Sequence, residues 1–111
     1  MHVISKDAST APVLDAAGER IFELLGAGKG LGNAQNHSII RLELAQGAYS
    51  PAVPHFHKQS EETYVILSGS AEIDIGGQLF PLARGDIAAV GIGEMHQITA
   101  TGDTAMTALA I

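Results

Sequence analysis

The segment PHFHKQSEETY, residues 54–64, gathers the side chains of this sequence that are best suited to bind a metal ion. It holds two of the chain's five histidines, His55 and His57, followed by two glutamates, Glu61 and Glu62. In a β-strand, residues two apart project to the same face, so the two imidazoles are expected to point together. A turn over the next residues would bring a glutamate from the following strand alongside them. A solvated polar loop could have the same composition, and the rest of the sequence must decide between the two.

A third imidazole, His96, lies 39 residues after His57 in the segment GEMHQIT. Its strand follows a Gly-Gly hairpin signal, so an antiparallel fold could bring it beside the first pair. Imidazole nitrogens combined with a carboxylate suit divalent Mn, Fe, Ni, Co, Cu or Zn, whereas Ca²⁺ and Mg²⁺ prefer oxygen ligands. The chain has no cysteine, which excludes thiolate ligands and disulfides. The donor set therefore favours a transition metal.

Strand alternation distinguishes the neighbouring candidates. If Glu62 faces the imidazoles, Glu61 faces solvent, and Tyr64 and Ile66 share the face of Glu62. The Tyr64 hydroxyl could bond a ligand or a metal-bound water, or it could belong to a packed tyrosine with a protein partner. Arg41 alternates with apolar residues in IIRLEL and is expected in water. Only another register would place Arg41 in the pocket, where it would bind a carboxylate.

Composition limits the class of protein. A chain of 111 residues with 46% hydrophobic and 16% charged residues is long and apolar enough for one globular domain. The net charge of −6 and the scattered Lys and Arg residues argue against a nucleic-acid surface. The N-terminus is too polar for a signal peptide, and no apolar run approaches membrane-spanning length. We therefore expect a cytoplasmic protein with neither a nucleic-acid nor a membrane partner.

From residue 38 onward the chain reads as short alternating strands separated by turn residues. The segments are SIIRLELA (38–45), ETYVILSG (62–69), SAEIDIGG (70–77), QLFPLARGD (78–86), IAAVGIG (87–93), HQITATGD (96–103) and TAMTALAI (104–111). Gly76-Gly77 joins two of them as a good hairpin signal. This spacing, with almost no helical periodicity, predicts a single all-β domain built as an antiparallel β-barrel or jelly roll.

Residues 1–37 carry weaker signals and are expected to lead into a domain over residues 38–111. ERIFELL, residues 19–25, fits either a helical stripe or an alternating strand. GAGKGLG, residues 26–32, lacks the spacing and the Ser or Thr of a phosphate-binding loop, which favours a flexible connector. Pro54 is expected near the start of an edge strand.

These segments resemble the cupins, specifically the single-domain members of that family of conserved β-barrels. The first cupin motif is a glycine, then His-x-His, three or four residues, Glu, six residues and Gly. His55, His57, Glu62 and Gly69 fit this motif, and Gly47 lies two residues further upstream than the usual leading glycine.

The second cupin motif is Gly, five residues, Pro-x-Gly, two residues, His, three residues and Asn. Gly85, Gly93 and His96 fit it, while Gly91 stands where Pro is usual and Ala100 where Asn is usual. The two motifs are separated by 15 residues, and the departures touch turn and strand positions instead of ligand positions.

The resemblance covers about residues 38–111 and implies that four side chains bind one divalent transition metal. The implied ligands are His55, His57, Glu62 and His96. Four protein ligands on a six-coordinate ion leave two adjacent positions for a substrate. Members of the family commonly pair through a sheet edge, and the apolar segments of residues 1–37 offer surface for that, so a homodimer is expected.

The resemblance also implies a pocket for one small ligand inside the barrel. By strand parity its wall would comprise Tyr64, Ile66, Ile98 and Ala100. The implied function is a small metal-dependent enzyme acting on a small polar or acidic organic molecule by dioxygenation, decarboxylation, isomerisation or lyase chemistry. Tyr64 would be one of its few proton carriers. The alternative is a non-catalytic cupin that binds or senses a small ligand.

Overall fold

The computed structural model describes residues 11–25, 38–55 and 61–111, and within these the chain forms β-strands and no helix. The larger sheet runs in the order β1 (Leu14–Ala16), β2 (Glu19–Leu25), β3 (Ile39–Leu44), β10 (Met106–Ala110), β5 (Glu62–Ser68) and β8 (Ile87–Val90). The smaller sheet runs in the order β4 (Tyr49–His55), β9 (His96–Ala100), β6 (Ser70–Ile75) and β7 (Gln78–Ala83). Neighbouring strands in both sheets are antiparallel.

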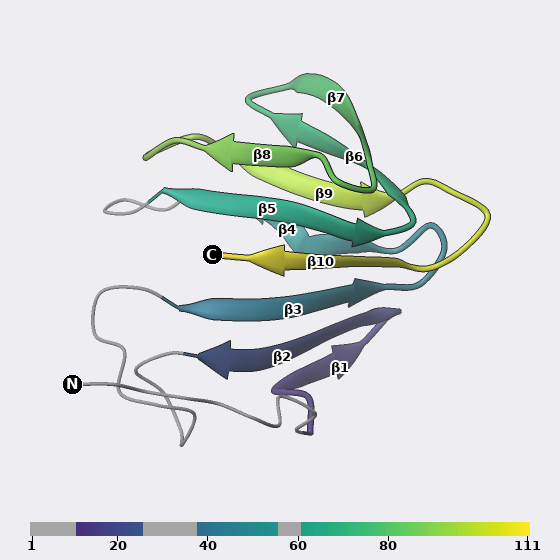
Figure 1. Ribbon diagram of the computed structural model, residues 1–111. Helices are drawn as coiled ribbons and strands as arrows, with labels where there is room; N and C mark the ends of the chain where they lie inside the picture. Colours follow the sequence, from purple (N-terminus) through teal and green to yellow (C-terminus); the bar gives the residue numbers. More distant parts are fainter. Residues whose placement is uncertain (1–10, 26–37, 56–60) are drawn as a thin grey trace.

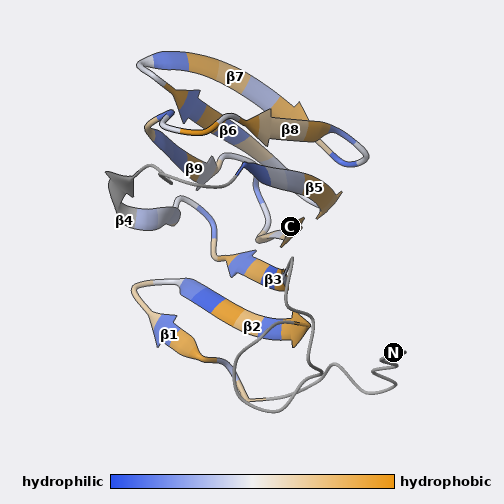
Figure 2. Cartoon of the chain, turned by 90° about the vertical axis from the view of Figure 1, so that its left-hand side faces the viewer, coloured by the Kyte–Doolittle hydropathy of each residue, from blue (hydrophilic) through white to orange (hydrophobic). Residues whose placement is uncertain are grey.

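The two sheets form the layers of a sandwich, with the smaller sheet behind the larger one in Figure 1. Each described sheet has its own hydrogen-bonded strand order, so the fold is a jelly roll and the layers do not close into one continuous barrel. Figure 2 shows β1 and β2 at one end of the larger sheet, with hydrophobic and hydrophilic residues alternating along the strands. The predicted all-β antiparallel fold is confirmed.

The β6–β7 hairpin shows how the sequence dictates a connection. Ile75 pairs with Gln78, so Gly76 and Gly77 form a two-residue turn. Their φ angles are 60° and 87°, as the favoured type of two-residue hairpin turn requires at both central positions. Asp74 Oδ1 accepts a hydrogen bond of 2.8 Å from the Gly77 amide and fixes the turn. The predicted hairpin is confirmed.

The core lies between the layers. Its largest fully buried apolar side chains are Leu42, Leu44, Ile66, Ile73, Ile98, Met106 and Val90. Each contributes about 1.5–3 kcal/mol by leaving water, and together they hold the ends of the strands in register.

The structure decides between the two interpretations of ERIFELL and corrects the expected position of Pro54. ERIFELL forms β2, which pairs with β3 of the same chain, so the strand interpretation holds. β4 begins at Tyr49, so Pro54 lies near the end of that strand and not at its start. β4 is nevertheless an edge strand, where a residue without an amide N–H is tolerated.

The boundary proposed at residue 37 stays a prediction. β1 and β2 precede it and extend the larger sheet through β3. GAGKGLG lies outside the described residues. The described part of the chain holds no helix that is both long and apolar enough to cross a bilayer.

Candidate metal centre

Three strand ends meet at one end of the sandwich. β9 starts at His96, and the backbone of His55, the last residue of β4, lies opposite it in the ladder. β5 starts at Glu62, whose Oε2 lies 3.9 Å from Nε2 of His96. The His96 side chain is fully buried, and that of Glu62 is 18% exposed. Residues separated by 34 positions thus place an imidazole and a carboxylate side by side.

The orientation of the His96 ring follows from a backbone contact. Its Nδ1 lies 3.1 Å from the carbonyl oxygen of Glu94. A carbonyl oxygen can only accept, so Nδ1 is the nitrogen that carries the proton in the neutral ring. The lone pair is then on Nε2, the nitrogen that lies towards Glu62. An imidazole fixed in this way is prepared to bind a metal through Nε2.

A tight turn over residues 91–94 fixes the position of the Glu94 carbonyl. The Gly91 amide donates 2.7 Å to Oε1 of Glu94, and the Glu94 amide donates 3.2 Å to the Gly91 carbonyl. Gly93, within the turn, has a φ of 80°, which L-residues with side chains seldom adopt. Proline, usual in the cupin motif at the position of Gly91, has no N–H and could not make the first bond. The sequence analysis missed Glu94, although a glutamate three residues after a glycine is compatible with such a side-chain bond.

Tyr64 joins Glu62 and His96 on the inward face of this end. Its ring meets the His96 ring edge-on, with centroids 6.1 Å apart. Its hydroxyl bonds the Glu62 carboxylate. Burial raises the pKa of the Tyr64 phenol well above its usual value, and the charge of Glu62, that hydrogen bond and the charge of Glu19 raise it further. The phenol therefore keeps its proton at neutral pH and donates to Glu62.

Glu19 is a second inward carboxylate that the sequence analysis did not single out. It is 8% exposed and pairs across the sheet with the buried residue Leu44. Its alternation with Ile21, which packs on the core, could have indicated the inward position. Glu19 and Glu62 act on Tyr64 in the same direction, since both disfavour a phenolate.

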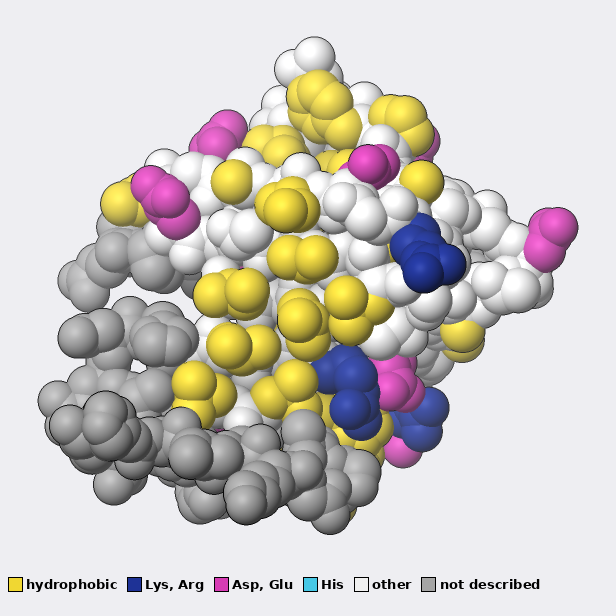
Figure 3. Space-filling model, viewed as in Figure 1, with side chains coloured by type: hydrophobic (Ala, Val, Ile, Leu, Met, Phe, Trp, Pro, Cys, Tyr) yellow, Lys and Arg dark blue, Asp and Glu magenta, His cyan; other side chains and the backbone are white. Residues whose placement is uncertain are grey.

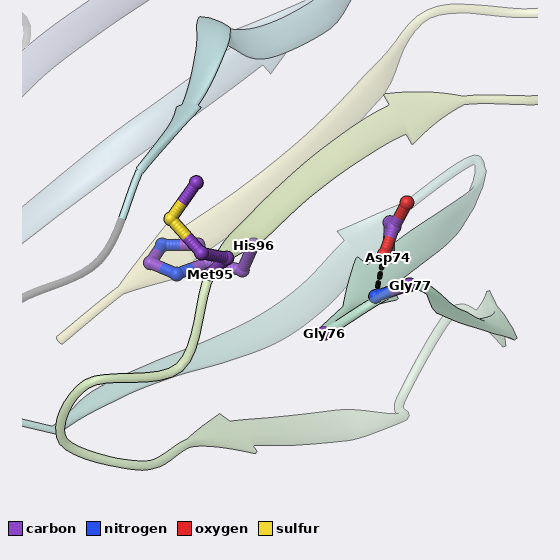
Figure 4. Close-up of a pocket in the computed structure, with 5 residues that line it drawn as sticks. All are labelled: Asp74, Gly76, Gly77, Met95 and His96. Carbon is purple, nitrogen blue, oxygen red and sulfur yellow. Dashed lines mark hydrogen bonds between the residues drawn. The ribbon is translucent and has the colours of Figure 1, made fainter.

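A cavity of about 350 Å³ opens beside His96. Figure 4 shows His96 and Met95 on one side of it, with Asp74 bonded to Gly77 on the other. The Gly76 amide donates 2.8 Å to the Met95 carbonyl and so ties the β6–β7 turn to the start of β9. His96 lines this cavity, although its imidazole is itself fully buried.

The other candidate residues of the segment 54–64 are described to different degrees. Glu61 is exposed, as strand alternation predicted. His57 lies outside the described residues, and His55 is placed by its backbone alone. Among the described side chains, no group of three or more His, Cys, Asp or Glu residues is arranged to hold a metal ion.

The four residues of the predicted pocket wall lie at different distances from His96. Tyr64, Ile66, Ile98 and Ala100 all face inward and are at most 3% exposed. Ala100, however, lies four residues after His96, which is about 13 Å along an extended strand. It pairs with Ala71 in the packed core. The structure therefore brings Tyr64 to His96 and leaves Ala100 at the opposite end.

Arg41 is not brought to this centre. It lies on the outer face of the larger sheet, opposite in direction to its buried neighbour Leu42. Its Nε donates 2.9 Å to Glu43, and its guanidinium covers the Phe22 ring at 4.3 Å. This is the water-facing alternative of the sequence analysis, in which Arg41 packs on the outside of the sandwich.

Comparisons with known proteins agree with this architecture. Residues 40–111 match a family model described as "Cupin domain", and no curated protein matches the sequence significantly. A predicted oxalate decarboxylase from Thermotoga maritima is 26% identical, with a TM-score of 0.76 over 99% of this chain and 96% of its own.

Two further solved structures share the fold at lower identity. A sugar phosphate isomerase from Silicibacter pomeroyi is 23% identical, with a TM-score of 0.72 over 84% of this chain and 57% of its own. Bacillus subtilis oxalate decarboxylase, described by its Mn(II) centres, is 18% identical, with a TM-score of 0.77 over 91% of this chain. The match covers only 27% of that decarboxylase's chain.

Proposed function

Because this chain belongs to the cupin family, we propose that it is a small metal-dependent enzyme. It binds one divalent transition metal, among Mn, Fe, Ni, Co, Cu and Zn, through His55, His57, Glu62 and His96. The single observation that carries the proposal is the convergence of Glu62 and His96, 3.9 Å apart, at the end of the sandwich where β4 ends.

The described donors fit a common ion. Two atoms that each lie about 2.1 Å from one metal can be at most about 4.2 Å apart. The separation of Glu62 Oε2 and His96 Nε2 is within this limit. Both atoms are electron-pair donors, so each can accept a proton or bind a cation, and a metal ion between them would be attracted to both.

The surrounding residues orient this pair. The Glu94 carbonyl keeps the proton of His96 on Nδ1, and the Tyr64 hydroxyl donates to the Glu62 carboxylate. Such outer contacts fix ligand direction and raise affinity for the ion. A bound ion would supply a Lewis acid and a template for substrate oxygens.

The substrate is a small polar or acidic organic molecule. Support comes from the names of fold neighbours: one is an isomerase of sugar phosphates, and two are described as oxalate decarboxylases, one of them only as predicted. Their substrates share closely spaced oxygen atoms that can bind a metal in pairs. The proposed reactions are accordingly decarboxylation, isomerisation, dioxygenation or lyase chemistry.

A binding-only cupin is the second candidate, and one observation favours it. The Tyr64 phenol keeps its proton, so the proton carriers described at this centre are Glu62 and His96, which are also the proposed ligands. An enzyme of this kind would therefore depend on Glu62 or on a metal-bound water for proton transfer.

Turnover by the metal-loaded protein separates the two candidates. The panel consists of oxo-acids, diketones and sugar derivatives, each also screened by thermal shift, with Glu62→Gln and Glu61→Gln as matched variants. An enzyme is supported by turnover that Glu62→Gln abolishes and Glu61→Gln preserves. A compound that stabilises the wild type without being consumed, when no compound is turned over, would establish the binding-only alternative.

A further inference from the structure

A second cavity opens between the β1–β2 hairpin of the larger sheet and the start of β4 in the smaller sheet. It has a volume of about 230 Å³, and its wall consists of Leu14, Ala16, Ala17, Glu19 and Tyr49. We call it the Glu19 cavity. In Figure 1 the turn of this hairpin lies at the end of the larger sheet where β3 ends, whereas β5 begins with Glu62 at the opposite end. The Glu19 cavity shares no lining residue with the cavity beside His96.

The pairing of β1 with β2 shows that the cavity lies on the inner face of the hairpin. Leu14 pairs with Ile21, and Ala16 pairs with Glu19. Directly opposed residues of an antiparallel pair share a face, and Ile21 packs on the core. Leu14 and Ala16 are nevertheless exposed on this inner face. The smaller sheet therefore leaves this part of the face uncovered, and the cavity is the space that remains.

Backbone hydrogen bonds hold the two sides of the cavity together. The Ala45 amide donates 2.8 Å to the Gly18 carbonyl, and the Ala48 amide donates 2.9 Å to the Ala45 carbonyl. A Cβ atom added at Gly18 would lie only 3.0 Å from Cβ of Ala48, so the two turns are closely packed. Glu19 follows one of these turns and Tyr49 follows the other. The positions of both residues are thus fixed by connected backbone.

Glu19 is the charged group of this cavity. The residue is 8% exposed, and in the described part of the chain its carboxylate has neither a hydrogen-bonding nor an ionic partner. The arginines of β2 and β3 lie on the outer face, where Arg20 and Arg41 both bond Glu43. Figure 3 shows this outer face, with the charged side chains towards its margins. A carboxylate held out of water without a partner is costly, so the cavity is suited to a ligand that donates to it.

We propose that the Glu19 cavity binds a small alkylammonium ion. Its nitrogen donates to the Glu19 carboxylate, and its alkyl body lies against Leu14 and Ala16. A carboxylate accepts hydrogen bonds only, and it bonds most strongly to a donor that carries a positive charge. Pockets for drug-sized ligands have volumes of about 300–1,000 Å³. A cavity of about 230 Å³ is smaller than these, which suits an amine of a few carbon atoms.

Other classes of ligand match the cavity less well. An anion would meet the charge of Glu19, and the arginines nearest in sequence already bond Glu43 on the other face of the sheet. A divalent metal ion needs several protein ligands, and the described side chains include no group of three or more His, Cys, Asp or Glu residues arranged to hold one. A neutral apolar molecule would displace water and leave the carboxylate without a partner. An alkylammonium ion satisfies both the carboxylate and the aliphatic wall.

A titration of the purified protein with n-butylammonium tests the proposal near pH 7, where this amine is protonated. Nuclear magnetic resonance should show saturable shifts of the methyl signals of Leu14, Ala16 and Ala17, which 1-butanol should not produce. Glu19→Gln keeps the shape of the side chain and removes its charge, so the affinity should fall about 10- to 100-fold. Glu23→Gln makes the same change elsewhere on β2 and should leave the affinity unchanged.

A second variant tests the cavity without touching the carboxylate. Ala16→Leu places a larger side chain in the cavity and should abolish the saturable shifts, while the strand-rich far-UV spectrum is retained. Nα-acetyl-lysine methylamide presents the same ammonium group on a bulkier molecule and should bind more weakly than n-butylammonium. Tighter binding of this lysine derivative would replace the free amine by a lysine of a protein partner and overturn the proposal.

Three further results would contradict the proposal. Absence of saturable shifts in the wild type would mean that solvent or a proton satisfies Glu19. Equal affinities of the wild type and Glu19→Gln would show that the carboxylate does not hold the amine. Equal binding of 1-butanol and n-butylammonium would show that the cavity recognises the alkyl chain and not the charge.

Discussion

The two ends of strand β9 are equally buried and chemically unlike. His96 and Ala100 are each 1% exposed and face the interior. His96 lies beside the carboxylate of Glu62 and next to a cavity, whereas Ala100 lies against Ala71 with its backbone bonded to Gly47 and Ala48. Burial and strand parity therefore identify the interior, and position along the strand decides whether a residue serves the metal centre or the packed core.

Ile98, midway along β9, should belong to the packed part. It is fully buried, so Ile98→Ala should lower the free energy of unfolding by about 2–5 kcal/mol through lost burial and the cavity left behind. Denaturant unfolding measures this loss, with the half-buried neighbour Thr99→Ser as control. Metal stoichiometry should be unchanged in the surviving folded protein. A loss below 1 kcal/mol, or loss of metal without loss of stability, would mean that the centre extends along the strand.

Tyr64 should belong to the metal part although it is part of the core cluster. Tyr64→Phe removes the donor to Glu62 and should weaken metal binding about 10- to 100-fold, as loss of an outer contact to a ligand commonly does. Competition with a fluorescent chelator measures the affinity. Tyr49→Phe, at the exposed other tyrosine, should leave it unchanged. Equal affinities of the two variants would exclude a positioning role for the Tyr64 hydroxyl.

Glu94 should have a smaller effect because its bond to the Gly91 amide is exposed. Glu94→Ala removes the acceptor and should weaken metal binding by about 0.5–1.5 kcal/mol, the usual net contribution of one hydrogen bond. Glu94→Gln retains an acceptor oxygen and should restore most of the affinity. The same chelator competition applies, and a loss shared by both variants would point to the charge of Glu94 instead of its hold on the turn.

The Tyr64 phenol gives a pH-dependent test of the metal end. Below about pH 10 the hydroxyl is protonated in both the folded and the unfolded chain, so its pKa shift does not alter stability there. Above pH 10 the unfolded chain loses the proton first, and the free energy of unfolding should fall as pH rises. In Tyr49→Phe, where Tyr64 is the only tyrosine, phenolate absorbance should rise only with unfolding. Phenolate in the folded protein near pH 10 would contradict the buried, Glu62-bonded position.

The sequence predicts the faces of the strands better than positions along them. Alternation forward from Glu62 correctly placed Tyr64 and Ile66 inside and Glu61 outside. It could not separate His96 from Ala100, because parity has a period of two residues and contains no distance to a third strand. The Gly76-Gly77 pair also predicted the β6–β7 hairpin, and both glycines have the positive φ that its turn requires.

Contacts made through the backbone were the least predictable part of the centre. The bond from His96 Nδ1 to the Glu94 carbonyl depends on the path of the Gly91–Glu94 turn and not on the type of residue 94. The inward position of Glu19 depends on whether ERIFELL is a strand, which its own pattern left open. The first depends on the conformation of a turn and the second on pairing with β3, and neither can be read from the residue types alone.

Metal analysis of three purified proteins tests the central claim most directly. The wild type, His57→Ala and Glu61→Ala are prepared identically, and bound transition metal per chain is measured by elemental analysis and by titration. We predict about one ion per chain for the wild type and Glu61→Ala, and an affinity at least about 100-fold lower for His57→Ala, which loses a ligand bond. A wild type that binds no transition metal, or equal losses in His57→Ala and Glu61→Ala, would contradict the proposed centre.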